Sequence, residues 1–104
     1  MTESDIMHSI MITISGRGHL IFRANVGKVL TADGRWFSTG LPKGFPDLFG
    51  VRKDGKAFFI EVKTPSGNLR PEQKKFLAAM EKRQIIAGVA RSSEDAVNIV
   101  EGGQ

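Results

Sequence analysis

Residues 44–63 read Gly-Phe-Pro-Asp-Leu-Phe-Gly-Val-Arg-Lys-Asp-Gly-Lys-Ala-Phe-Phe-Ile-Glu-Val-Lys, and this stretch decides the fold. Two apolar runs flank the turn sequence Lys53-Asp54-Gly55. A strand, a glycine-containing turn and a second strand together predict a β-hairpin. The rest of the chain is interpreted outward from this hairpin.

The charged residues of the hairpin are predicted to converge on one side of it. A three-residue loop with Gly55 in the left-handed position pairs Arg52 with Lys56, and counting back along both strands places Asp47 opposite Glu61. Because side chains alternate along a strand, Glu61 and Lys63 share one face. Isolated charges on such an apolar hairpin are costly. A metal ion bound between the carboxylates removes that cost.

Composition places the chain among soluble, single-domain proteins. Its 104 residues suit one domain with one core, and 40% of them are hydrophobic and 25% charged. No apolar run reaches the roughly 18 to 20 residues of a membrane span. The acidic N-terminus lacks the basic region of a signal peptide. With no cysteine, disulfides, thiolate zinc sites and cysteine nucleophiles are excluded, and a cytoplasmic or nucleoid-associated location is expected.

Positive charge is concentrated in the middle of the chain. Residues 17–83 hold fourteen Lys and Arg against six Asp and Glu, a net charge of +8, whereas residues 1–16 and 84–104 each carry −2. A basic middle favours a polyanionic partner. A solvated basic surface explains the charge equally well.

Residues 2–15 are predicted to form the first helix. Apolar residues recur there at helical spacing, and Thr2 with Asp5 resembles a capping box. Glu3 begins the apolar face of this helix. It is interpreted either as a carboxylate favouring the positive helix N-terminus or as an acid directed at an active site. Asp5 is the alternative acid, but it lies off that face.

A short strand is predicted at residues 19–24, and an exposed hairpin insert at about 28–38. Trp36 and Phe37 lie on its returning strand. We favour packing of this extra hairpin as their role, with base stacking or a partner interface as alternatives. A loop at 38–46 follows, and Pro46 holds the approach to Asp47 rigid.

The second half of the chain predicts a helix at 71–83, a strand at 85–91 and a final helix after Ser92-Ser93-Glu94. Gln73 begins the buried face of the first of these helices, so it is interpreted either as its N-terminal cap or as a site residue. Residues 101–104 are expected to be a frayed tail. The order of elements predicts one α/β domain over residues 1–104, with a mixed central sheet flanked by helices and an α-β-β-β-α-β-α core.

The chemistry best supported by the hairpin is that of a hard divalent cation. Asp47 and Glu61 offer oxygen ligands suited to Mg²⁺ or Mn²⁺, which activate water and stabilise charge on a phosphodiester. Lys63 is placed to position or deprotonate the attacking water, or to balance charge. A cross-strand ion pair is the alternative for Glu61 and Lys63, but their apolar flanks argue against it. His8 and His19 lie outside any ligand-spaced cluster and are expected to be structural or exposed.

These motifs resemble the PD-(D/E)xK nuclease superfamily, and within it the VRR-NUC family of virus-type replication–repair nucleases. The match extends over about residues 2–100. The segments that carry it are Arg23-Ala24-Asn25-Val26-Gly27, Gly44-Phe45-Pro46-Asp47-Leu48, Glu61-Val62-Lys63-Thr64-Pro65 with Gly67, and Pro71-Glu72-Gln73, after an early helix with Glu3. Gln84 departs from the pattern, because a glycine is expected where the second helix ends.

The resemblance implies a Mg²⁺- or Mn²⁺-dependent DNA nuclease with no organic cofactor. By position, Asp47, Glu61 and the backbone carbonyl of Val62 would hold the metal. Lys63 would be the catalytic lysine and Gln73 a helper. Glu3 would be a further acid, reaching the site directly or through water.

The size and layout of the chain resemble phage-type members of the family that dimerise and cut branched DNA such as four-way junctions. We therefore expect a structure-selective endonuclease acting as a Holliday-junction-resolvase-like homodimer, with Trp36-Phe37 as the dimer contact. The residues expected to contact phosphates are Lys43, Arg70, Lys74 and Lys75. The alternative is a non-catalytic nucleic-acid-binding module that retains the nuclease fold.

Overall fold

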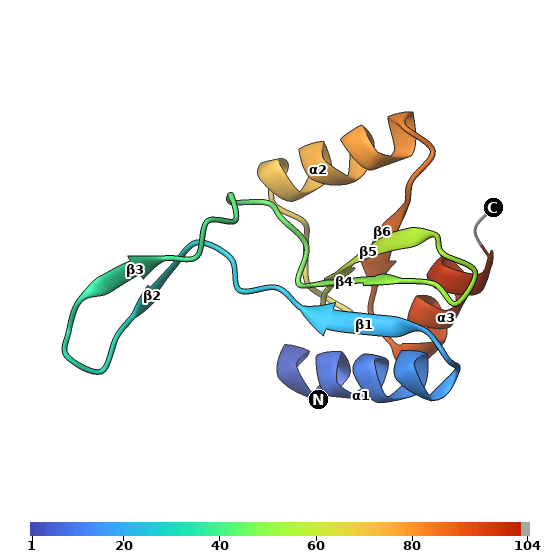
Figure 1. Ribbon diagram of the computed structural model, residues 1–104, viewed down its shortest axis with the longest axis horizontal. Coiled ribbons are helices and arrows are strands. Elements are labelled where there is room, and N and C mark those ends of the chain that lie inside the picture. Colours follow the sequence, from blue (N-terminus) through green and yellow to red (C-terminus); the bar gives the residue numbers. More distant parts are fainter. Residues whose placement is uncertain (103–104) are drawn as a thin grey trace.

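The computed structural model describes residues 1–102 of the chain (Figure 1). Its elements, in order, are α1 (Glu3–Gly16), β1 (Leu20–Arg23), β2 (Lys28–Leu30), β3 (Trp36–Ser38), β4 (Leu48–Val51), β5 (Ala57–Val62), α2 (Pro71–Lys82), β6 (Ile86–Ala90) and α3 (Ser93–Gly102). This order confirms the predicted α/β fold with its extra hairpin.

Four strands form the central sheet in the order β1-β4-β5-β6. β1, β4 and β5 are antiparallel, whereas β6 runs parallel to β5 after the α2 crossover, so the sheet is mixed as predicted. The predicted register of the β4–β5 hairpin is confirmed. Leu48 pairs with Ile60, and the Arg52 N–H donates to the Lys56 carbonyl at 2.7 Å.

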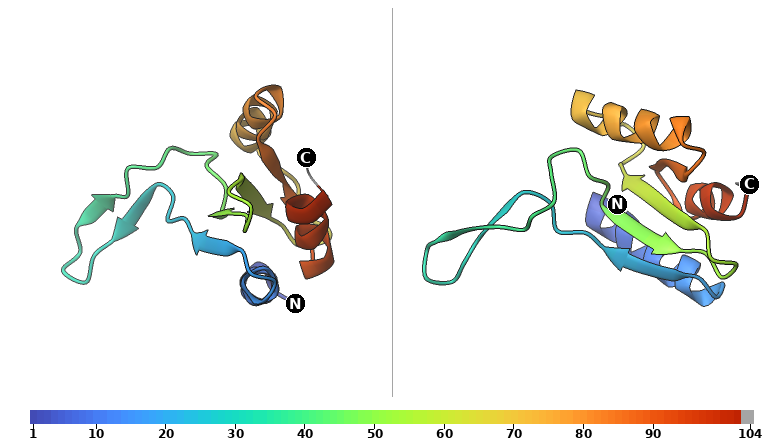
Figure 2. Two further views of the ribbon diagram at one scale, coloured as in Figure 1. Left: turned by 45° about the vertical axis from the view of Figure 1, so that its right-hand side comes forward. Right: turned by 45° about the horizontal axis from the view of Figure 1, so that its top comes forward.

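Helices cover both faces of this sheet (Figures 1 and 2). α1 and α3 pack on one face and close the main core with the alternate residues Phe58, Ile60 and Val62 of β5, all fully buried. Burying each such side chain contributes about 1.5–3 kcal/mol. α2 covers the other face, where Phe76 meets Phe45 and Phe59 at ring-centroid distances of 5.2 and 5.5 Å.

The caps of the helices follow the sequence closely at their N-termini. At α1 the Thr2 hydroxyl accepts from the Asp5 N–H, and the Asp5 carboxylate accepts from the Thr2 N–H. Asp5 is therefore a structural cap. At the end of α2, Gln84 adopts φ 59°, a left-handed conformation that favours glycine. The N–H of Ile85 reaches back to the Met80 carbonyl at 2.9 Å, so this turn keeps the usual hydrogen bonding despite its side chain.

The β2–β3 hairpin extends away from the sheet in every view (Figures 1 and 2). Its strands pair only with each other, with Leu30 opposite Trp36 and Val29 opposite Phe37. Trp36 is 69% exposed and Phe37 59%. The favoured interpretation was that Trp36 and Phe37 pack the hairpin. It is wrong, because the hairpin forms a separate sheet and both side chains remain largely exposed.

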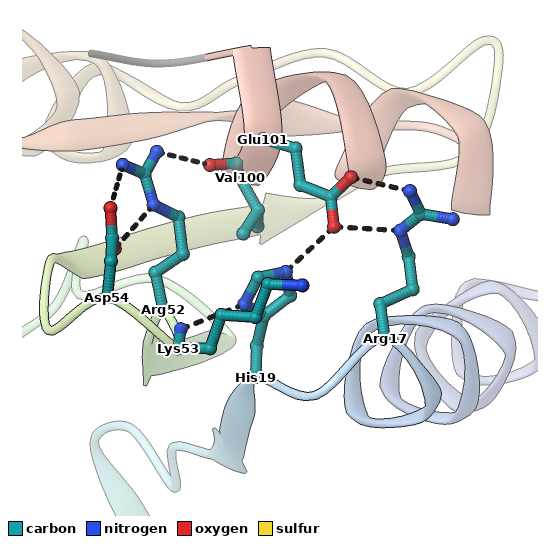
Figure 3. A network of polar contacts seen from close by, with 7 residues as sticks. All are labelled: Arg17, His19, Arg52, Lys53, Asp54, Val100 and Glu101. Atoms are coloured by element: carbon teal, nitrogen blue, oxygen red, sulfur yellow. Dashed lines mark hydrogen bonds and ion pairs between the residues drawn. The ribbon is translucent and has the colours of Figure 1, made fainter.

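The expected fraying of residues 101–104 is wrong for its first two residues. α3 continues through Gly102, and Glu101 is fixed by an ion pair with Arg17 and a hydrogen bond from His19 (Figure 3). Its carboxylate accepts from Arg17 Nη2 at 2.6 Å and from His19 Nε2 at 2.8 Å. Residues 103–104 lie outside the described part of the chain.

His19 is structural, as expected, whereas His8 is exposed. The Lys53 N–H donates to His19 Nδ1 at 3.0 Å, so the ring proton is on Nε2 and points to Glu101. This imidazole ties the β4–β5 turn to the end of α3 (Figure 3). Within residues 1–102, the helices are too short or too polar to span a bilayer.

The contacts of Glu101 with Arg17 and His19 are expected to make folding stability depend on pH. Hydrogen bonds from Arg17 and His19 lower the pKa of Glu101 from 4.5 to about 2. Because the folded state favours the carboxylate, this stabilisation is present above about pH 4.5 and is lost as pH falls towards 2. Calorimetric Tm values should fall more steeply across that window for wild type than for Glu101→Gln. The exposed Glu94→Gln on the same helix should keep the wild-type slope, and equal slopes for all three proteins would contradict the assignment.

Candidate active site

The predicted acidic residues meet where β4 begins and β5 ends. Asp47 directly precedes β4, and one step beyond the Leu48–Ile60 pair brings it opposite Glu61. Its Oδ2 accepts from the Val62 N–H at 2.9 Å, which holds the Asp47 side chain against β5. The Asp47 carboxyl group lies close enough to Glu61 to raise the pKa of Glu61. The convergence inferred from the hairpin register is thus present.

Burial disfavours the charged form of Glu61 in this carboxyl pair. Glu61 is only 3% exposed. Desolvation is the largest cause that raises the pKa of Glu61 to about 9, followed by the hydrogen bond and the charge of Asp47. Glu3 adds to the increase, and Lys63 opposes it. Without a cation the protonated form of Glu61 is therefore favoured, and a bound cation would stabilise its carboxylate.

Lys63 lies beside this pair, as its spacing from Glu61 predicts. It is 9% exposed, and its charge acts on Glu61. Its backbone N–H donates to the Ala90 carbonyl at 3.1 Å, which extends the β5–β6 pairing by one residue. The lysine therefore stands on a main chain that is fixed by the neighbouring strand.

A cavity of about 610 Å³ opens over the carboxyl pair, between the starts of α1 and α2. Its lining brings together residues far apart in the sequence, among them Glu3, Arg23, Lys43, Asp47, Glu61, Val62, Arg70 and Gln73. A second cavity, of about 580 Å³, lies at the other end of the domain around His19 (Figure 3). There Arg17 and Arg52 are paired with Glu101 and Asp54, so its charges are neutralised internally.

The comparisons with known proteins agree with this geometry. The VRR-NUC domain family model matches residues 19–94, a range that contains Asp47, Glu61, Lys63 and Gln73. The chain belongs to the VRR-NUC family. VRR-NUC domains are generally nucleases.

A solved structure described as a VRR_NUC domain has the same fold. It superposes with a TM-score of 0.69 at 21% sequence identity, covering 95% of this chain and 94% of that chain. No curated protein matches the chain.

The oxygen donors of this VRR-NUC domain fit a hard divalent cation. Asp47 and Glu61 provide two adjacent carboxyl groups, and Val62 lies on the same cavity wall. Within the described part of the chain, no three His, Cys, Asp or Glu side chains gather closely enough to hold a metal. An ion bound here would therefore complete its shell with water, backbone carbonyl or phosphate oxygens.

Glu3 and Gln73 both line the cavity from the first turns of their helices. Glu3 is exposed and belongs to no three-ligand group, so the direct contact considered for it is not formed in this structure. Gln73 is 5% exposed, and its Oε1 accepts from the Arg70 N–H at 2.8 Å. Arg70 has no acceptor atom to reciprocate. Gln73 thus caps α2 and borders the cavity at once, so its two interpretations are compatible.

Gly44 is a residue of the site that sequence reasoning gave no role of its own. Its φ is +91°, and a Cβ atom there would lie 2.5 Å from the backbone oxygen of Glu72. The loop therefore rests directly on the first turn of α2. Phe45 then enters the aromatic cluster, and Pro46 is fully buried. The signal for this role in the sequence was the glycine that precedes Phe45-Pro46. Together these three residues fix the position of Asp47.

The basic residues proposed for DNA contact divide into two groups. Lys43 and Arg70 line the cavity, whereas Lys74 and Lys75 are exposed on α2 outside its lining. Arg23 also lines it, although the sequence analysis gave this residue no role of its own. Its position at the end of β1, within the Arg23–Gly27 segment, was the signal for it.

Substituting Gly44 tests how tightly this loop is docked. Gly44→Ala should lower the free energy of unfolding by more than Gly55→Ala, by at least about 1 kcal/mol. Both glycines have positive φ, but a Cβ at Gly55 would meet nothing within 4 Å. The difference therefore isolates the contact with Glu72 from backbone strain. Urea unfolding of the two variants measures it, and equal losses would show that the loop yields without cost.

Proposed function

We propose that this VRR-NUC domain is a Mg²⁺- or Mn²⁺-dependent DNA endonuclease that cuts branched DNA. The observation that carries the proposal is the pair of half-buried Asp47 and buried Glu61 beside Lys63, at the wall of a cavity bordered by basic residues. A buried pair of this kind has little structural value, because apolar side chains would fill the same space without a desolvation penalty. It is explained by cation binding.

Asp47 and Glu61 would hold the ion together with the Val62 carbonyl. When bound, such an ion lowers the pKa of water and neutralises charge on a phosphodiester. Lys63 would orient or deprotonate the attacking water, or balance charge as the scissile bond breaks. Gln73 would orient a water or phosphate oxygen through its amide group, and Glu3 would act through a bridging water.

Binding of the DNA backbone would fall to the basic residues around the cavity. Lys43 and Arg70 border the carboxyl pair, and Lys74 and Lys75 extend the positive surface along α2. Contacts to phosphates carry little sequence information and weaken with salt. Selectivity would therefore depend on the shape of the DNA, and the cytoplasm or nucleoid of a bacterial or phage-infected cell is the setting that suits this substrate.

Cleavage assays with junction, flap and linear DNA test the proposal. Wild type should cut in Mg²⁺ or Mn²⁺ and not in EDTA. Glu61→Gln should reduce cleavage at least about 100-fold while DNA binding persists, because it removes a ligand charge but keeps the size of the side chain. Glu72→Gln, which borders the same cavity, should leave the rate within about threefold. Binding of DNA by folded wild type without any metal-dependent cutting would favour the non-catalytic module instead.

We further propose that the domain acts as a homodimer through the β2–β3 hairpin. An isolated two-stranded hairpin is only marginally stable in water. This one exposes Leu30 and Trp36 on one face, and Val29 and Phe37 on the other. A second copy would cover these apolar side chains. A twofold dimer would also supply two sites for the two cuts that a four-way junction requires.

Sedimentation equilibrium tests the dimer. Wild type should be dimeric at micromolar concentration, and Trp36→Ala should raise the dissociation constant at least about tenfold, because the loss of one large interface side chain costs more than 1 kcal/mol. Ile12→Ala is the matched control, since Ile12 is 73% exposed on α1, away from the hairpin. A monomeric wild type would remove the geometric basis for junction resolution and leave the nuclease proposal intact.

A further inference from the structure

Arg91 sits directly after β6, and its guanidinium group lies against the turn that follows Lys63. Its Nη1 donates to the carbonyls of Thr64 and Gly67, each at 2.6 Å, with the Pro65 carbonyl at 3.4 Å. Its own backbone N–H donates to the Asp95 carboxylate at 2.9 Å, at the start of α3. One cationic side chain thus gathers carbonyls from residues 64–67.

The gathered turn lies beside the Lys63 side chain. The Gly67 N–H closes the turn onto the Thr64 carbonyl at 3.0 Å. A Cβ atom on Gly67 would lie 3.5 Å from Lys63 Cδ and 3.1 Å from Thr64 Oγ1. Gly67 therefore lies beside the aliphatic part of Lys63, about the width of a methyl group away from it. Holding this turn in place restricts where the lysine ammonium group can go.

The same strand end also fixes the main chain of Lys63. Ala90 is fully buried, and its carbonyl accepts from the Lys63 N–H at 3.1 Å. Ala90 and Arg91 are consecutive. The end of β6 therefore binds the Lys63 main chain through Ala90 and the turn after Lys63 through Arg91. A guanidinium group suits this task, because its donors lie in a rigid plane and it remains charged.

From this geometry we propose that Arg91 is a positioning residue for Lys63, which clamps the turn 64–67 onto the lysine stem. The inference rests on the proposed nuclease function, since it assigns Arg91 to the reaction through Lys63. The residue touches neither the carboxyl pair nor the cavity lining. Its loss should therefore slow turnover without weakening DNA binding.

A double-mutant cycle tests this coupling. Arg91→Gln should lower kcat about 10- to 100-fold, because small misplacements of a reacting group have effects of that size, with the DNA dissociation constant within about twofold. In a Lys63→Gln background the same change should cost less than about threefold, since the group it positions is gone. Arg91→Lys, which keeps the charge, should recover part of the rate. Equal losses in both backgrounds, or a loss in DNA affinity alone, would overturn the proposal.

A second readout does not require cleavage. The ¹³Cε resonance of Lys63, assigned by its disappearance in Lys63→Gln, should move in Arg91→Gln towards the position of the exposed lysines. The amide of Gly67 should exchange faster, whereas that of Gly55, in the distant β4–β5 turn, should not. If Arg91→Gln fails to fold, Gly67→Ala tests the same contact from the other side.

Cleavage by wild type separates the two ideas. Absent cleavage refutes the proposed function, and the resonance of Lys63 still decides whether the clamp exists. Cleavage with an unmoved Lys63 resonance refutes the clamp alone.

Discussion

The closure of the β4–β5 hairpin is the constraint on which the rest of the structure depends. The Arg52–Lys56 hydrogen bond fixes the loop at three residues, and every pair behind it follows from that length. A slip of one residue would exchange the two faces of β5. Glu61 and Lys63 would then enter the core in place of Ile60 and Val62. The apolar alternation of β5 makes that slip prohibitively costly, so the core enforces the geometry of the site.

The site is thereby built on rigid elements, although it is assembled from distant parts of the chain. β5 provides the floor, and the loop before β4 brings Asp47 to it because Gly44 and Phe45 anchor on α2. The first turns of two helices, on opposite faces of the sheet, then close the cavity. Residues of both first turns line the same cavity as the carboxyl pair. The two cores hold these elements in place, so folding fixes the geometry of the site.

The sequence predicted most of this arrangement because its signals were local. Hydrophobic periodicity, the Thr2 cap and the glycine turn each depend on residues that are close in the sequence. The turn fixes the register of the hairpin, and the register places Asp47 opposite Glu61. The contacts that were missed are the ones that span the chain. Glu101 was assigned to a frayed tail because its partners, Arg17 and His19, lie about 80 residues earlier. Arg91 and Gly44 likewise act through surfaces that exist only once the sheet is formed.

The β2–β3 hairpin, which carries Trp36, differs from the body of the domain because its apolar side chains are exposed. Its strands were predicted from the residues of the turn. The pattern of a strand does not indicate which surface covers its exposed face. Both faces of the hairpin carry exposed apolar side chains, whereas Phe58, Ile60 and Val62 of β5 in the sheet beside it are fully buried. The exposure of these side chains of the hairpin supports the proposal that a second copy of the chain covers it, whereas the candidate active site is assembled from residues of one chain.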